Sequence, residues 1–388
     1  MQRFSLPLSS FKCKILNLCY TYCMFQENIN SGRQLEFDIA KFLVVINLAP
    51  IHSVIECSTD EVLAHGFPFF YDSVLGGPLA APMFLFAMGV GFVYSKCHSA
   101  KGFFYRGLKL LLVGFALNIL RFFLPFITGY LITHSAEQYI EPLWYRVFGN
   151  DVLQFASLSL ILMALLKALK LPDLGILLTA VIMRIAGIFL SGFDANNQIL
   201  NVLLGHFIAV EDSAEMVFSD FPLLSWFIVP VSGYIFGKKL ISCSDADKKK
   251  LYMILSVPCL IFAVIWFTKG IINASGMFDE GQNSYYHMGI ADTFASICAV
   301  LALLGIYNLF AAKLPERVLY LIVQISRATT HVYFIQWVLV MWLTDFLLYI
   351  IRGNQFLPQL YSILLGYLIS LISVGFALFI RKKSIQGK

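Results

Sequence analysis

A histidine and a glutamate one helical turn apart, His52 and Glu56, stand at the end of an apolar stretch of the sequence. Residues spaced i and i+4 share one face of a helix, so the carboxylate could orient the imidazole. An oriented imidazole can serve as a general base or as a nucleophile. The alternative is that His52 is a packed interfacial residue and Glu56 a solvated residue at a helix end. The spacing alone favours neither interpretation.

Two arginines, Arg121 and Arg184, lie inside other apolar stretches. A guanidinium stays ionised, so it needs a partner or a water-filled cavity rather than lipid. Asp292, about one turn inside a later apolar stretch, is a candidate counter-ion. Such charges could stabilise a developing oxyanion, or they could form an ion pair that only fixes helix packing. We therefore predict a catalytic set made of His52, Glu56, Arg121, Arg184 and Asp292.

Basic residues at the opposite ends of the apolar stretches suggest a second kind of chemistry. Lys96, Arg106 and Lys109 flank the second and third stretches. Cationic side chains there could bind the phosphates of a donor such as coenzyme A. The competing explanation is the ordinary enrichment of lysine and arginine in cytoplasmic loops.

The composition shows what kind of scaffold must position these residues. Of 388 residues, 59% are hydrophobic and only 13% are charged, whereas a soluble domain carries about 25% charge. The chain is therefore predicted to be an all-α, multi-pass integral membrane protein. Apolar runs of about 20 residues indicate about ten transmembrane helices. The predicted spans are 39–57, 75–95, 107–127, 152–169, 174–192, 221–240, 251–268, 288–312, 330–351 and 360–380.

Lysine and arginine are distributed unevenly between the two sides of these predicted spans. The loops on one side hold only Arg146, Lys269 and Arg352, and most of the loop acids. The opposite side carries the remaining loop cations and both termini, so both termini are predicted to be cytoplasmic. Residues 1–32 are expected to form a basic, interfacial segment, and residues 33–388 a single transmembrane domain. We expect it to lie in a bacterial cytoplasmic membrane.

Two stretches in the predicted spans 75–95 and 221–240 open with prolines and close with glycines. The first is 76–91, with Pro78, Pro82 and Gly89, and the second is 220–237. Proline frees a backbone carbonyl and glycine permits close helix contact, so each stretch is either a packing seam or the wall of a site. Broken helices of this kind also occur in transporters built from repeats.

Several other kinds of chemistry lack support in the sequence. The eight cysteines show no paired spacing typical of a metal site, and we expect neither a metal nor a disulfide framework. No phosphate-binding loop, dinucleotide fingerprint, zincin motif or nucleophile elbow is present. The net charge of +5 follows the membrane topology and does not indicate nucleic-acid binding.

The first half of the chain resembles a known family. The pattern Asp38-x-x-Lys41-x10-His52 resembles the first-helix motif of transmembrane acyltransferases, although lysine stands where arginine is commoner. The closer likeness is to the catalytic domain of the heparan-alpha-glucosaminide N-acetyltransferase family. The further pieces that carry it, in chain order, are Ala81-Pro-Met-Phe-Leu-Phe-Ala-Met-Gly89, Arg106-Gly-Leu-Lys-Leu-Leu, Asp151-Val-Leu-Gln154 and Phe221-Pro-Leu-Leu-Ser-Trp226 with Gly233.

The resemblance implies transfer of an acyl group, acetyl in the first instance, from cytoplasmic acyl-CoA. The acceptor would be a sugar hydroxyl or amine of a glycan or glycolipid on the outer side. His52 matches the family histidine, and Asp38 and Lys41 join the donor-binding set. Membrane lipid is a further expected partner, and a homodimer is compatible with this organisation.

Two other functions compete with this prediction. The first is a secondary transporter or exporter of a small polar or anionic solute, and the second is a membrane scaffold without activity. Buried arginines and an intramembrane histidine cost free energy, which disfavours the scaffold.

Overall fold

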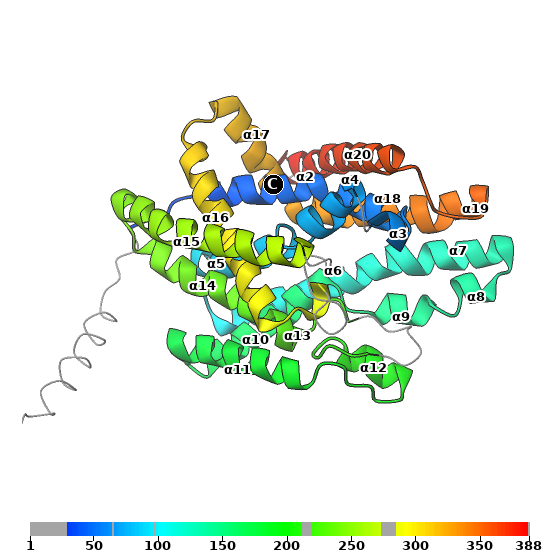
Figure 1. The fold of residues 1–388 in the computed structure, drawn as a ribbon, viewed down its shortest axis with the longest axis horizontal. Coiled ribbons are helices and arrows are strands. Elements are labelled where there is room, and N and C mark those ends of the chain that lie inside the picture. The colour runs from blue at the N-terminus through cyan, green and yellow to red at the C-terminus, as the bar shows by residue number, and fades with distance from the viewer. Residues whose placement is uncertain (1–28, 64–65, 97, 212–218, 273–284, 387–388) are drawn as a thin grey trace, which may run out of the picture.

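The computed structural model describes residues 29–63, 66–96, 98–211, 219–272 and 285–386 (Figure 1). Within these ranges the chain is helical nearly throughout, and its one extended pairing is an isolated bridge between Phe193 and Val210. The prediction of an all-α fold is therefore confirmed. The predicted segment 1–32 lies almost wholly outside the described residues.

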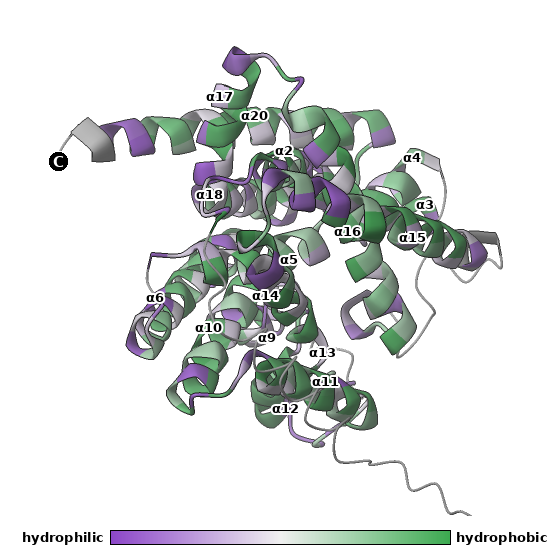
Figure 2. Cartoon of the chain, turned by 90° about the vertical axis from the view of Figure 1, so that its left-hand side faces the viewer, coloured by the Kyte–Doolittle hydropathy of each residue, from purple (hydrophilic) through white to green (hydrophobic). Residues whose placement is uncertain are grey.

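Eight helices, or runs of consecutive helices, are long and apolar enough in the described part of the chain to cross a membrane. Hydrophilic residues gather at helix ends, as at the C-terminal end of α20 (Figure 2). Four spans consist of single helices, α2 (Leu35–Glu56), α15 (Asp245–Ile272), α16 (Ile290–Ala311) and α20 (Gln359–Gln386). The composite spans contain α4 (Gly66–Phe69), η1 (Phe70–Gly76) and α5 (Ala81–Tyr94); α6 (Ala100–Asn118), η2 (Ile119–Phe123) and α7 (Leu124–Thr133); α8 (Ala136–Tyr139), α9 (Leu143–Phe148) and α10 (Val152–Ala168); and α18 (Thr329–Met341), η5 (Trp342–Leu348) and α19 (Tyr349–Arg352).

Two of the ten predicted spans are not among these eight. Residues 174–192 form α11 (Asp173–Phe189), which has only 17 residues. Residues 221–240 divide into α13 (Leu223–Trp226) and α14 (Ile228–Ile241). The count of ten and the side on which the termini lie therefore stay predictions. The shorter helices that connect the long ones are α3 (Asp60–Leu63), α12 (Gln198–Leu204), η4 (Tyr285–His287) and α17 (Glu316–Arg327).

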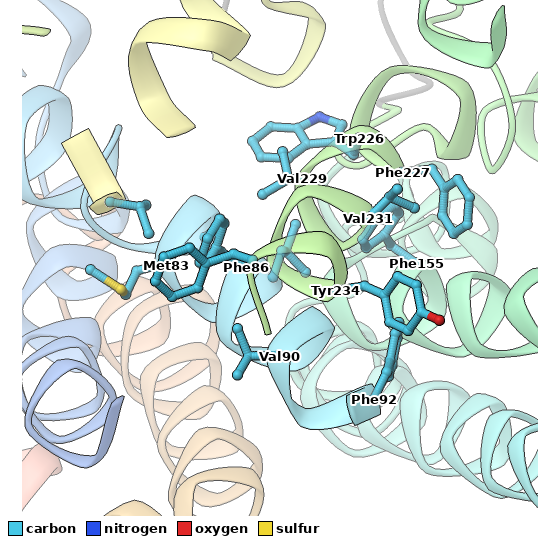
Figure 3. Packing of buried hydrophobic residues seen from close by; sticks show 14 of the residues in the cluster. Met83, Phe86, Val90, Phe92, Phe155, Trp226, Phe227, Val229, Val231 and Tyr234 are labelled. Carbon is cyan, nitrogen blue, oxygen red and sulfur yellow. The ribbon is translucent and has the colours of Figure 1, made fainter. Parts of the chain in front are cut away.

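The glycines of α5 and α14 form a seam at which the two backbones touch. A β-carbon added to Gly89 would lie 1.8 Å from the carbonyl oxygen of Pro230, and one added to Gly233 would lie 2.1 Å from that of Phe86. No residue with a side chain fits at such a distance. Buried apolar side chains, Trp226 among them, surround the contact (Figure 3). The packing interpretation therefore accounts for these glycines.

The helix that carries His52 is fixed by a contact with α20. Pro50 lies inside α2 and has no N–H group, so the carbonyl of Ile46 loses its helical partner. The hydroxyl of Ser370 donates to that carbonyl at 2.9 Å. Gly366 allows the approach, because a β-carbon there would lie 2.3 Å from the α-carbon of Pro50. The proline thus creates a specific joint between the first and last spans.

Candidate active site

A cavity of about 440 Å³ opens where α2 ends and where α5 and α10 begin. The distribution of basic residues predicts that this end of the bundle faces outward. Both His52 and Glu56 line the cavity, as does Arg121. The other ionisable side chains in its lining are Asp72, Arg146, Asp151, Asp220, Tyr285, Tyr286 and Tyr333.

The imidazole of His52 is held by stacking. Its ring lies on the indole of Trp337 in α18, with centroids 3.8 Å apart and planes inclined by 26°. Among the described residues, its Nδ1 atom has no hydrogen-bond partner. No hydrogen bond within the described chain joins His52 to Glu56, although both line the cavity. The ring is therefore oriented by an aromatic neighbour, Trp337, and not by Glu56.

The guanidinium of Arg121 is also held in a fixed position. Its Nη2 atom lies 2.7 Å from Oδ2 of Asp151, and Nη2 and Nε donate to Oδ1 of Asn118 at 2.9 and 3.2 Å. The hydroxyl of Tyr333 donates to Asp151 at 3.0 Å. The guanidinium carbon lies 4.7 Å from the ring centroid of Trp337, close enough for a cation–π contact. Arg121 and His52 thus share one aromatic neighbour.

Local backbone chemistry explains why Arg121 points into the cavity. Pro125 has no N–H group to bond the carbonyl of Arg121 four residues earlier, and the helix widens there into the π-helical turn η2. The indole of Trp342 donates to the neighbouring Leu120 carbonyl at 2.9 Å. On the opposite side, Asp151 is the N-cap of α10 and accepts from the amide of Val152 at 2.6 Å. Each partner of the ion pair therefore sits at a helix irregularity.

A group of carboxylates surrounds Arg146, which also lines the cavity. The exposed Arg146 interacts electrostatically with Glu56, Asp220 and Asp345, and Asp345 in turn lies near Glu56. Burial in the cavity, together with the nearby Asp151 carboxylate, raises the pKa of Asp220 to about 7. The positive charges of Arg146 and Arg121 oppose this rise in the pKa of Asp220 without cancelling it. The surroundings of Arg146 are therefore rich in acid groups.

Arg184 and Asp292, the other members of the predicted catalytic set, are not in the cavity lining. Arg184 is buried and donates from Nη2 to the carbonyl of Met288. Asp292 accepts from the indole of Trp266 at 2.7 Å and from the amide of Gly289 at 3.2 Å. The two charges are close enough to interact. Their contacts with Met288 and Gly289 lie just after Tyr285 and Tyr286 in the chain.

The predicted donor-binding residues separate into two places at the other end of the bundle. Lys96 lines a cavity of about 530 Å³ together with Lys167, Lys238 and Tyr234. Arg106 is adjacent, donating to the hydroxyl of Ser95 at 2.9 Å, and Ser95 also lines this cavity. Lys109 is exposed on α6 and is not part of the lining.

Asp38 and Lys41 are not part of this basic cavity. Asp38 is buried, and its carboxylate lies 2.5 Å from Nε of Arg33 and 3.8 Å from Nζ of Lys41. The hydroxyl of Ser326, near the end of α17, donates to Asp38 at 2.6 Å. These contacts fasten α17 to the start of α2. Among the described residues, no group of three or more His, Cys, Asp or Glu side chains is placed to hold a metal ion.

Several residues in the outer cavity were not predicted from the sequence as parts of a site. Asp151 occupies a position typical of a helix N-cap. Capping alone explains an aspartate there, so the sequence does not mark it as a site residue. Tyr333 and Trp337 share a helix face by their spacing, but aromatic residues in an apolar helix ordinarily pack. Asp220 appears in the sequence as one of many outer loop acids. None of the four carries a distinguishing sequence signal beyond the family-like context of Asp151.

The family model described as heparan-alpha-glucosaminide N-acetyltransferase, catalytic, matches residues 33–269, and so confirms the resemblance predicted from the sequence. No curated protein matches the chain. The matched residues include His52, Arg121 and Asp151. Two elements of the cavity, η4 with its tyrosines and α18 with Tyr333 and Trp337, lie beyond them.

Proposed function

The chain belongs to the heparan-alpha-glucosaminide N-acetyltransferase catalytic-domain family, and from this premise we propose that it acylates a sugar at the outer cavity. The donor is acyl-CoA, acetyl-CoA in the first instance, and the acceptor is an amine or hydroxyl of a glycan or glycolipid. The observation that carries the proposal is the cavity itself. It brings His52, stacked on Trp337, together with the Arg121–Asp151 pair inside an apolar helix bundle.

The basic cavity at the other end supports binding of the donor from the cytoplasmic side. Lys96, Lys167 and Lys238 surround it, and ammonium groups attract phosphates. The helix α5 connects the two cavities, since Phe84 lines the outer one and Phe92 the basic one. These residues are eight positions apart, or roughly 12 Å along a helix. A linear thioester arm suits such a separation between the phosphates and the reacting carbon.

The chemistry assigned to the outer cavity requires a base and an oxyanion donor. The acceptor nitrogen or oxygen attacks the thioester carbonyl carbon, forming a C–N or C–O bond while the C–S bond breaks. An imidazole nitrogen of His52 takes the acceptor proton and returns it to the departing thiolate, so coenzyme A leaves as the thiol. Nη1 of Arg121 makes no hydrogen bond among the described residues, and it is available for the negative carbonyl oxygen.

The acidic lining favours an amine over a hydroxyl as the acceptor. Four carboxyl groups, those of Glu56, Asp72, Asp151 and Asp220, line the cavity with two guanidiniums, and Asp220 adds its charge only as pH rises through about 7. An ammonium group is attracted to the carboxylates that are ionised, and it can pass its extra proton to one of them before the neutral amine attacks. A hydroxyl gains no comparable electrostatic attraction. A sugar amine is therefore the acceptor that we propose.

The transporter alternative rests mainly on the two proline- and glycine-rich spans. The glycines of those spans are explained by the direct contact between α5 and α14. The acyltransferase proposal accounts in addition for the position of His52 and of the basic cavity. Flux of a solute across liposomes without any acyl-CoA would favour the transporter.

The proposal is tested with purified protein and radiolabelled acetyl-CoA, first without an acceptor and then with glucosamine. Wild type is compared with His52→Ala and with His331→Ala, which alters an exposed histidine of α18. We expect His52→Ala to lower transfer by about 10²- to 10⁴-fold, while His331→Ala stays near wild type. Label retained on the protein would indicate an acyl-His52 intermediate, and its absence direct transfer. Undiminished transfer by His52→Ala would overturn the catalytic assignment.

A further inference from the structure

A short segment after the family match contributes two tyrosines to the outer cavity. We propose that Tyr285 and Tyr286, here called the tyrosine wall, form the subsite that binds the ring of the sugar acceptor. We infer also that Arg184 is a positioning residue for this wall. The inference rests on the proposed function, because it assigns the acceptor of that reaction to one side of the outer cavity.

The tyrosine wall belongs to a cluster of four aromatic rings beside Asp220. The ring centroids of Tyr285 and Tyr286 are 5.0 Å apart, and Tyr286 meets Phe221 at 5.1 Å with perpendicular planes. Trp226 closes the cluster, 5.6 Å from Tyr285. Tyr286 is 37% exposed, so this ring remains accessible. Aromatic faces carry partial negative charge and attract the C–H groups of a sugar ring.

The chemistry around the wall favours a polar ring over an apolar ligand. Asp220 and Phe221 both line the cavity with the two tyrosines. A carboxylate beside aromatic faces can accept hydrogen bonds from hydroxyl or ammonium groups while the ring stacks. An apolar ligand would leave that carboxylate without a partner. A sugar carrying an amine satisfies both kinds of contact.

The wall is too short to hold its own position. Tyr285–His287 form a single 3₁₀ turn. Neighbouring parts of the chain form hydrogen bonds to Tyr286, His287 and Met288. The indole of Trp226 in α13 donates to the carbonyl of Tyr286 at 2.8 Å, and Nε2 of His287 lies 2.9 Å from the hydroxyl of Ser219. Arg184 in α11 donates to the carbonyl of Met288. Successive residues are thereby fastened from different sides.

The position of Arg184 needs a reason, because a buried guanidinium costs free energy unless it is paired. Its side chain is only 6% exposed, while Leu178, Ile182 and Ile185 of the same helix are exposed. Its hydrogen bond goes to a backbone carbonyl, and its electrostatic partner is Asp292, the N3 residue of α16. Both contacts converge on the junction between the wall and α16. Arg184 therefore fixes where the wall ends.

The wall also lies outside the residues that match the family model, which end at 269. The groups assigned to proton transfer and oxyanion binding lie inside that match. The matched part of the chain contributes Asp220 and Phe221 to the subsite, and the two tyrosines come from beyond it. Variants of the wall are expected to change acceptor binding while leaving the donor reaction intact.

The first experiment compares Tyr286→Leu with Tyr286→Phe, and uses Tyr361→Leu, an exposed tyrosine of α20, as a remote control. Loss of one aromatic stacking contact is expected to raise the KM for glucosamine about tenfold in Tyr286→Leu. Tyr286→Phe and Tyr361→Leu should stay within about twofold, and acetyl-CoA binding should be unchanged in all three. An unchanged KM in Tyr286→Leu, or a parallel loss of donor binding, would overturn the subsite.

The second experiment separates positioning from general support of the fold. Arg184→Gln and Arg184→Lys are compared for thermal stability, kcat and the KM for glucosamine. A positioning role predicts a raised KM in Arg184→Gln with partial recovery in Arg184→Lys. Lower stability and lower kcat with an unchanged KM would contradict it. If Arg184→Gln does not fold, Arg184→Lys is the test. A KM for glucosamine above the wild-type value supports positioning, and an unchanged KM contradicts it.

Failure of the proposed function gives a different result from failure of the wall. Calorimetric titration of glucosamine needs no acyl-CoA, so it measures the subsite directly. A wild-type protein that binds glucosamine more tightly than Tyr286→Leu, yet never acylates it, would keep the subsite and refute the acyltransferase. Equal binding by both proteins would refute the subsite, whatever the transfer assay shows.

Discussion

Arg121 and Asp151 form an ion pair of 2.7 Å that joins a π-helical turn to the N-cap of α10. Both side chains are buried, and both line the outer cavity. Both members of the pair also contact α18. Tyr333 of that helix donates to Asp151, and the ring of Trp337 lies under Arg121. A buried pair of this kind constrains geometry more than it adds stability.

Breaking that pair on one side should be more damaging to the fold than removing both charges. Arg121→Gln leaves the buried Asp151 carboxylate without its cation, and we expect a loss of roughly 3–5 kcal/mol. The double variant Arg121→Gln/Asp151→Asn should regain most of this stability without regaining transfer. Thermal denaturation in detergent measures the first quantity, and labelled acetyl transfer measures the second. Equal stability of the single and double variants would contradict the pairing.

The raised pKa of Asp220 gives a prediction about pH. As pH rises through about 7, Asp220 becomes ionised, and binding of a cationic amine should strengthen. Because the folded-state pKa lies above the unfolded value of about 3.9, Asp220 stabilises the fold at low pH. This contribution is lost between about pH 4 and pH 7. Asp220→Asn should flatten both profiles relative to wild type, measured by glucosamine titration and by thermal denaturation.

The basic cavity predicts which lysines bind the donor. Lys96→Ala and Lys238→Ala, combined, should weaken acetyl-CoA binding by about tenfold, and the difference should shrink at high salt. Lys109→Ala is the matched control, because Lys109 is exposed on α6 outside the cavity. Equilibrium binding at two ionic strengths checks this. An equal effect from Lys109→Ala would mean that the overall positive face attracts the donor, without a defined site.

The seam between α5 and α14 predicts a sharp contrast between two glycines of one helix. Gly89→Val would place a side chain into the backbone of Pro230, whereas a β-carbon on Gly91 meets nothing within 4 Å. Gly89→Val should destabilise the protein by at least 1–3 kcal/mol, roughly the cost of overpacking a core. Gly91→Val should be tolerated. Yield of folded protein and its melting temperature distinguish the two variants.

Much of the fold could be predicted from hydropathy, because lipid requires long apolar helices with satisfied backbones. The two predicted spans that differ, α11 and α13–α14, are those in which short length or proline interrupts the helix. For the site, one cavity brings His52 together with Glu56 and Arg121, and their catalytic roles stay predictions. Arg184 shows the limit of such reasoning. Its burial could be anticipated, but which surface it supports depends on how distant segments meet.

The aromatic members of the site illustrate the same limit. Trp337 and Tyr333 are separated from His52 by almost 300 residues, and nothing local marks them as different from packing residues. Their roles arise from the contact of α18 with α2 and with the N-cap of α10. These contacts form only when the helices have packed together, so they cannot be inferred from the local sequence.

The participation of α18 in the cavity also has a consequence for biogenesis. Chains are synthesised from the N-terminus, and early segments fold first. The helix with His52 is therefore made long before the helix that supplies Trp337 and Tyr333. Until α18 is inserted, the imidazole lacks its stacking partner and the Asp151 carboxylate lacks a hydrogen-bond donor. Under the proposed function, the site is therefore assembled only after α18 has packed against α2 and the N-cap of α10.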